Sequence, residues 1–184
     1  RPEIAQDLID AIKNDREVFV RRGKLNGNMS TNKLKLGSRT TLVKNLLIVD
    51  GISRSGKFVS GNILTGFQGV EPIQCRGPLE SLPFLEHFGF LDKKAAQELL
   101  LQEVDVACYE MLIGRNLNHR RGDLSSIFNH PLSKQYLRRA RQADGDVVVK
   151  RYVKEQPYSL FVTHELASNA KLYFETFPNL KVIC

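Results

Sequence analysis

Cysteine is scarce in this sequence, with only Cys75, Cys108 and Cys184 among 184 residues. The three are odd in number and widely spaced, and they form neither a Cys-x-x-Cys pair nor a zinc-ligand pattern. This usage is typical of buried or incidental thiols in a reducing compartment. We therefore expect a cytoplasmic protein without a cysteine-based metal site.

Long apolar runs are also absent. The longest, residues 46–49, is far shorter than the ~18 residues that a membrane-spanning helix needs, so we expect no membrane segment in this chain. No signal peptide is recognisable. Because the chain begins at Arg1 rather than Met and ends at Cys184 inside an apolar run, we expect it to be a piece of a longer protein.

Basic residues outnumber acidic ones, with 27 Lys and Arg against 20 Asp and Glu, for a net charge of +7. No nucleic-acid recognition motif or aromatic RNA-binding signature accompanies this charge, so we expect no nucleic-acid partner. The basic clusters either attract smaller anions, such as nucleotides or sulfated sugars, or form solvated helix faces. They are Arg21-Arg22, Arg120-Arg121, Arg138-Arg139-Arg141 and Lys150-Arg151.

The apolar pattern alternates between short strand-like runs and helical periodicity. Such alternation predicts an α/β fold, with a mainly parallel sheet covered by helices on both faces. The clearest predicted strands are residues 45–50, 158–162 and 180–184. The clearest predicted helices are residues 57–65, 92–113 and 168–177.

Other segments are less clearly patterned. We predict a short strand at 70–74, a helix or pair of turns at 78–90 broken by Pro83, a long loop at 116–131 and a helix at 132–143. Periodicity does not decide between helix and strand at 147–153. Before the first core strand we predict an N-terminal extension, residues 1–44, with a helix at 2–15, a short strand at 16–20 and a loop at 23–38.

The most informative stretch is residues 46–61, LLIVDGISRSGKFVSG. A buried-strand pattern ends at Asp50, and Gly51 to Lys57 then fits the phosphate-loop spacing G-x-x-x-x-G-K and opens a helix. The first N–H groups of a helix have no internal partner, and the helix dipole favours an anion there. Glycines at both ends of the loop allow the backbone to approach a ligand closely. We therefore predict a phosphate-binding loop.

The loop side chains add charge and hydrogen-bond donors, but not a metal ligand. In nucleotide triphosphatases, a Ser or Thr after the lysine binds Mg²⁺. Phe58 stands at this position and has no hydroxyl, so magnesium-dependent hydrolysis is disfavoured and we expect no metal. The residues predicted to bind the ligand are Gly51, Ile52, Ser53, Arg54, Ser55, Gly56, Lys57 and Phe58.

A second motif, LFVTHE at residues 160–165, places His164 at the carboxyl end of a predicted core strand. Open α/β sheets bind ligands at this edge, and His is well suited to proton transfer near neutral pH. A single histidine is usually structural. Together with the phosphate loop, however, His164 becomes a candidate catalytic residue.

These motifs resemble those of the sulfotransferases, which use the P-loop nucleotide fold to transfer sulfuryl groups. RSGK, Arg54 to Lys57, takes the place of the family's basic-Ser-Gly loop, which binds the 5′-phosphosulfate of 3′-phosphoadenosine 5′-phosphosulfate (PAPS). VTH, residues 162–164, is similar to the family's Lys-Thr-His, with Val162 in place of lysine. FPNLKVIC, residues 177–184, is similar to the stretch preceding the family's 3′-phosphate motif, whose Arg and Ser would follow Cys184.

The resemblance implies a P-loop sulfotransferase-like domain over residues 45–184, incomplete at its C-terminus. It implies PAPS as donor substrate, a hydroxyl acceptor, His164 as base, and Arg54 and Lys57 as catalytic cations. The basic clusters suggest an anionic acceptor such as a glycan, or they hold the donor instead.

Two other functions stay open. The intact G-x-x-x-x-G-K also fits a P-loop kinase or another nucleotide-dependent phosphotransferase. A non-catalytic phosphate-binding module is the third candidate, and in it His164 is a packed structural residue. The sequence does not define the oligomeric state.

Overall fold

The computed structural model describes residues 41–184, with the backbone alone at 167 and 168. These residues belong to one compact unit of the chain. The helix predicted at 2–15, the strand at 16–20, the loop at 23–38 and most of the extension 1–44 lie outside the described residues.

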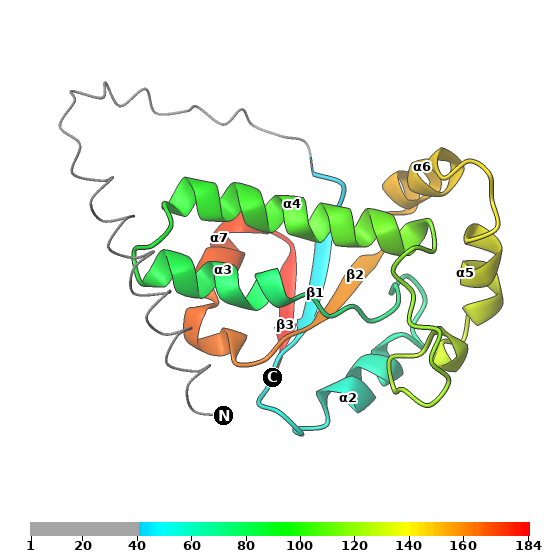
Figure 1. Cartoon of the computed structure of the whole chain (residues 1–184), viewed down its shortest axis with the longest axis horizontal. Coiled ribbons are helices and arrows are strands. Elements are labelled where there is room, and N and C mark those ends of the chain that lie inside the picture. The colour runs from blue at the N-terminus through cyan, green and yellow to red at the C-terminus, as the bar shows by residue number, and fades with distance from the viewer. Residues whose placement is uncertain (1–40) are drawn as a thin grey trace, which may run out of the picture. The chain divides into compact units, whose positions relative to one another are not determined.

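Three parallel strands form the described sheet, in the order β2-β1-β3 (Figure 1). They are β1 (Asn45–Val49), β2 (Tyr158–Val162) and β3 (Leu180–Ile183). The central strand β1 reads NLLIV and is buried along almost its whole length, as expected for a parallel strand covered on both faces. All three strands match their predicted positions to within one residue.

Six helices accompany the sheet in residues 41–184. They are α2 (Lys57–Leu64), α3 (Gly77–His87), α4 (Lys93–Leu112), α5 (Ser133–Arg139), α6 (Asp146–Glu155) and α7 (Lys171–Thr176), with 3₁₀ turns η1 (Ile127–Asn129) and η2 (Leu166–Asn169). The undecided segment 147–153 is thus helical. The predicted strand at 70–74 pairs with β2 only through two isolated parallel bridges, from Val70 and Gln74.

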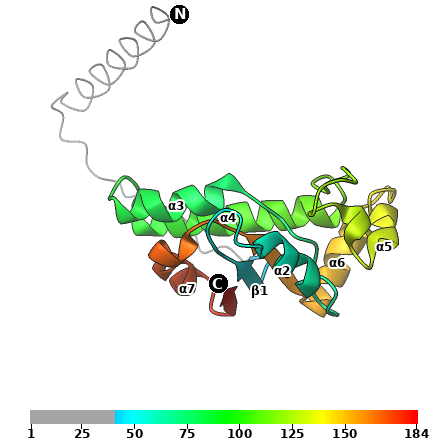
Figure 2. The same cartoon turned by 90° about the horizontal axis from the view of Figure 1, so that it is seen from below.

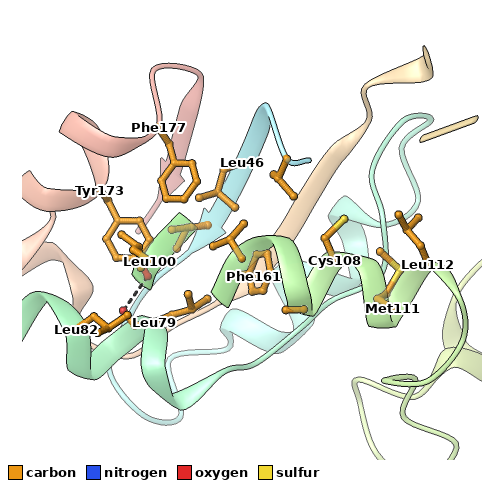
Figure 3. Packing of buried hydrophobic residues seen from close by; sticks show 14 of the residues in the cluster. Leu46, Leu79, Leu82, Leu100, Cys108, Met111, Leu112, Phe161, Tyr173 and Phe177 are labelled. Atoms are coloured by element: carbon orange, nitrogen blue, oxygen red, sulfur yellow. Dashed lines mark hydrogen bonds between the residues drawn. The ribbon is translucent and has the colours of Figure 1, made fainter. Parts of the chain in front are cut away.

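Helices cover both faces of the sheet because alternate side chains of each strand point in opposite directions. On one face, side chains of β1 and β2 form an apolar cluster with Phe58 and Leu64 of α2. The opposite face carries Leu46, Ile48 and Phe161, which pack with residues of α3, α4, α6 and α7 (Figure 3). There, α3 and α4 run side by side (Figures 1 and 2). The predicted α/β class with a parallel sheet is therefore observed.

The expectation that Pro83 breaks the segment 78–90 is wrong, since α3 continues through it. Proline has no N–H, so the carbonyl of Leu79, four residues earlier, loses its helical donor. The hydroxyl of Tyr173 in α7 donates to this carbonyl at 2.7 Å instead (Figure 3). A tertiary hydrogen bond thus satisfies the group that the proline leaves open.

Across residues 41–184, no helix combines the length and the apolar character required to cross a bilayer.

Candidate functional site

The predicted phosphate loop connects the carboxyl end of β1 to the start of α2, and residues 52–56 are all exposed. The neighbouring strand β2 ends at the same edge, since Val49 pairs with Val162 and the Thr163 N–H donates to the Val49 carbonyl at 3.1 Å. The parallel sheet therefore brings the loop and the segment that carries His164 to one edge.

The loop backbone is tightly curved, with positive φ angles at three of its residues. Gly51 has φ 155°, Arg54 has φ 65° and Gly56 has φ 85°. The φ of Gly51 is one that L side chains rarely adopt, so the curve favours glycine there, and a Cβ at this position would also force the Ser55 hydroxyl to rotate away. Arg54 adopts the left-handed region without being glycine, as Gln156 at the end of α6 and Glu165 also do in the described residues.

Lys57 is buried beneath this curve, with 4% of its surface exposed. Its ammonium donates to the carbonyl of Gly51 at 2.8 Å and to that of Ile52 at 3.2 Å. An ammonium has three N–H donors, so one remains beyond these two bonds. The loop thus wraps around a positive charge.

The N-terminus of α2 has no side-chain cap. Gly56 is the N-cap residue, and the first turn contains no acidic residue. Within the described chain, the N–H groups of Lys57 and Phe58 have no backbone acceptor. Together with the helix dipole and the Lys57 charge, these donors favour an anion at the loop.

Three loop side chains differ in what they can offer a ligand. Arg54 is exposed, and Ile52 is 65% exposed. The Phe58 side chain instead packs against the apolar cluster of β1 and β2, so only its backbone N–H is available to a ligand.

A buried aspartate ties the loop to the β2 edge. Asp50, 4% exposed, accepts hydrogen bonds through Oδ1 from the Thr163 hydroxyl at 2.8 Å and the Leu166 N–H at 2.9 Å. Neither Asp50 nor Thr163 was predicted from the sequence to have this role. The sequence feature that could have indicated this role is the position of both residues, because each is a polar residue directly after a buried strand.

His164 contacts an acidic residue from a different element. Glu80, in the first turn of α3, accepts through one oxygen, Oε1, from the His164 backbone N–H at 2.8 Å, and the same oxygen lies 2.8 Å from His164 Nδ1. The two side chains are 42% and 33% exposed. His164 is therefore accessible rather than packed in the core, and its partner Glu80 was not predicted from the sequence.

Cys75 lies within electrostatic reach of both parts of the site. The residue is exposed overall, yet the protein atoms around its sulfur and the nearby Glu80 carboxylate raise the pKa of the thiol to about 11, against the opposing effect of Lys57. The thiol is therefore protonated at neutral pH, when it is a poor nucleophile. We assign Cys75 no part in the chemistry of the site.

In the part of the chain that the structure describes, no three His, Cys, Asp or Glu side chains gather as a metal site requires.

No protein-family model, curated protein or solved structure matches this chain. Only the residues of the site, and the motifs that they form, therefore bear on its function.

Proposed function

We propose that residues 45–184 form a sulfotransferase domain of the P-loop type, which moves a sulfuryl group from PAPS to a hydroxyl acceptor. The observation that carries this proposal is the exposed, uncapped loop wrapped around the buried Lys57 ammonium. The segment of His164 lies at the same edge of the sheet, and the residue after the lysine has no hydroxyl for Mg²⁺.

In this proposal the loop holds the 5′-phosphosulfate. The N–H groups at the start of α2, the remaining Lys57 donor and the Arg54 guanidinium stabilise the negative charge that grows on the leaving phosphate. Catalysis then consists of positioning and electrostatic stabilisation, as in phosphoryl transfer. The proposed reaction requires hydrogen-bond donors in fixed positions rather than a metal ion.

His164 removes the proton of the acceptor hydroxyl as its oxygen attacks sulfur. A new S–O bond forms to the acceptor, and the bond between sulfur and the bridging phosphate oxygen breaks. The bond's electrons leave with 3′-phosphoadenosine 5′-phosphate (PAP), and the proton stays on His164 until solvent removes it. The products are a sulfate ester and PAP.

An anionic acceptor such as a glycan is our proposed acceptor class. The basic residues Arg138, Arg139 and Arg151 line a cavity of about 370 Å³ between α5 and α6. Arg139 pairs with Glu71 at 3.1 Å and Arg151 pairs with Glu155 at 2.7 Å, so Arg138 is the residue whose charge would attract an anionic group in this cavity. The three cysteines are free thiols, which suits the proposed cytoplasmic location.

A P-loop kinase is the second candidate, because the G-x-x-x-x-G-K spacing is intact and Lys57 lies under the loop. Calorimetric titrations separate the two. We expect PAP to bind in the presence of EDTA, and we expect Lys57→Met to weaken binding about 10- to 100-fold by removing a charge-assisted contact. Lys134→Met, an exposed change on α5, is the matched control and should bind PAP like the wild type.

Other results would favour the alternatives. Binding of ATP only together with Mg²⁺, without binding of PAP, would support the kinase and contradict our proposal. A non-catalytic module would bind PAP, yet the wild type would show no release of PAP from PAPS beyond that of His164→Ala.

A further inference from the structure

The contact between Glu80 and His164 joins residues 84 positions apart in the chain. A single carboxylate oxygen faces two nitrogens of His164, the backbone N and Nδ1, each at 2.8 Å. The backbone nitrogen always carries a hydrogen and donates it. The carboxylate oxygen is an acceptor, so the hydrogen of the second contact must come from Nδ1.

This arrangement determines where the neutral imidazole keeps its proton. A neutral histidine has one N–H and one unprotonated nitrogen, and the hydrogen bond made by one nitrogen sets the state of the other. With its proton on Nδ1, His164 has an unshared electron pair on Nε2. Nε2 is then the nitrogen that can accept a proton from a substrate.

We propose that Glu80 is a positioning residue, which orients His164 and holds its proton on Nδ1 so that Nε2 acts as the base. This inference rests on the proposed sulfotransferase function for its catalytic consequence. The tautomer itself is a property of the two side chains, and it can be measured without any turnover.

Both partners are held from several directions. Glu80 follows Leu79, whose side chain is fully buried and whose carbonyl accepts from Tyr173. His164 lies between Thr163 and Leu166, which both donate to Asp50. Two well-packed elements, α3 and the segment after β2, therefore fix the distance between Glu80 and His164.

The backbone next to His164 also departs from ordinary geometry. Glu165 has φ 56°, in the left-handed region that a non-glycine residue rarely adopts. Such conformations persist only where the surrounding structure enforces them, and they are common at functional sites.

A purely stabilising role explains the contact less well. Both side chains are about a third or more exposed, so water competes for the imidazole N–H and the net gain in stability from this hydrogen bond is small. A contact that contributes little to folding, but holds an accessible imidazole in one orientation, is better suited to proton transfer.

In the reaction, the proton of the acceptor hydroxyl moves to Nε2 while the acceptor oxygen bonds to sulfur and PAP departs with the bond's electrons. His164 then carries protons on both nitrogens, and its positive charge lies beside the Glu80 carboxylate. The carboxylate stabilises this charge as it forms and itself takes up no proton.

Nitrogen NMR of the full chain, at a pH where His164 is neutral, tests the proposal. We expect Nδ1 of the wild type to show the chemical shift of a protonated nitrogen and Nε2 that of an unprotonated one. Glu80→Gln keeps a carbonyl oxygen that accepts both hydrogen bonds, so the Nδ1 proton should remain. In Glu80→Ala the proton should move in part to Nε2.

Activity and binding give two further readouts. With water as acceptor, PAP release from PAPS should fall about 10- to 100-fold in Glu80→Ala and less in Glu80→Gln. PAP affinity should stay within about twofold of the wild type in both, because neither variant changes the loop. Glu86→Gln on the same helix is the control, and it should change neither the tautomer nor the rate.

The outcomes separate this inference from the proposed function. A wild-type Nε2 that carries the proton, or a tautomer unchanged in a folded Glu80→Ala, overturns the role of Glu80 even where PAP binds. Absence of PAP binding with the expected tautomer overturns the sulfotransferase function but leaves the orientation of His164 by Glu80 in place.

Discussion

Lys57 and Phe58 are neighbours in sequence, but their side chains serve different parts of the molecule. The Lys57 ammonium donates to the loop carbonyls of Gly51 and Ile52. Phe58 packs against the apolar cluster of β1 and β2 and anchors the start of α2 to the sheet. The sequence pattern predicted both as ligand-binding residues, because spacing alone does not indicate which way each side chain points.

His130 illustrates a residue whose charge state depends on folding. It is 6% exposed, its Nδ1 accepts from the Leu132 N–H at 2.9 Å, and its ring packs edge-on against Tyr136. Burial, and secondarily the positive charge of Arg139, lower the pKa of His130 from 6.5 to about 4.

The lowered pKa of His130 predicts a loss of stability in acid. Between pH 6.5 and pH 4 the unfolded chain binds a proton at this position that the folded chain does not. Above about pH 6.5 His130 is neutral in both states and does not lower the free energy of unfolding. As the pH approaches 4, the free energy of unfolding falls by up to about 3 kcal/mol. Urea unfolding at about pH 7 and about pH 4.5 measures this loss.

His130→Asn is the informative variant, because its amide oxygen can accept from the Leu132 N–H but does not titrate. It should lose about 2–3 kcal/mol less stability than the wild type between the two pH values. An identical loss in His130→Asn and the wild type would show that His130 does not cause it.

At the scale of elements, strong local patterns predicted position well. The helix predicted at 92–113 is α4, Lys93–Leu112, and Asp92 caps it by accepting from the N–H groups of Lys94 and Ala95. The buried strands β1 and β2 were likewise clear, because short apolar runs bounded by polar residues admit few alternatives.

Elements that depend on distant partners could not be predicted. The segment 147–153 has no decisive periodicity, and the carbonyl that Pro83 leaves without a helical donor is bonded by Tyr173, 94 positions from Leu79. The pairing of Glu80 with His164 has the same origin. Nothing in the local sequence of either residue indicates the other.

Tyr173 donates the hydrogen bond that Pro83 cannot give to the Leu79 carbonyl. We therefore predict that the effects of mutating Tyr173 and Pro83 on stability are coupled. Burial, and secondarily the Glu80 carboxylate, raise the pKa of the Tyr173 hydroxyl, so it remains an O–H donor. Tyr173→Phe leaves the Leu79 carbonyl without a donor and should destabilise the protein by about 1–3 kcal/mol in chemical unfolding.

A double-mutant cycle with Pro83→Ala checks the mechanism. The alanine introduced by Pro83→Ala brings an N–H that can donate to the Leu79 carbonyl, so Tyr173→Phe should cost less in this background. Tyr109→Phe, which removes the hydroxyl of a residue that is 38% exposed, is the control and should change stability by less than about 0.5 kcal/mol. If Tyr173→Phe lowers the free energy of unfolding equally in both backgrounds, the Tyr173 hydroxyl does not stand in for the N–H that is missing at position 83.

At the scale of the molecule, the parallel sheet explains why the candidate site exists at one edge. β1 and β2 run in the same direction and in register, so the loop after Val49 and the segment after Val162 emerge together. Asp50 then joins the two by hydrogen bonds to Thr163 and Leu166. The sequence pattern predicted that the loop and His164 each follow a core strand, whereas the bonds that join the two segments required the structure.

The most direct test of the account is a nitrogen NMR titration of the full chain with PAP in the presence of EDTA. We predict that the backbone N–H signals of residues 53–58 shift as PAP binds, while those of α5 stay in place. Loop signals that remain unchanged at saturating PAP, or that shift only after Mg²⁺ is added, would contradict a metal-independent phosphate site in this loop.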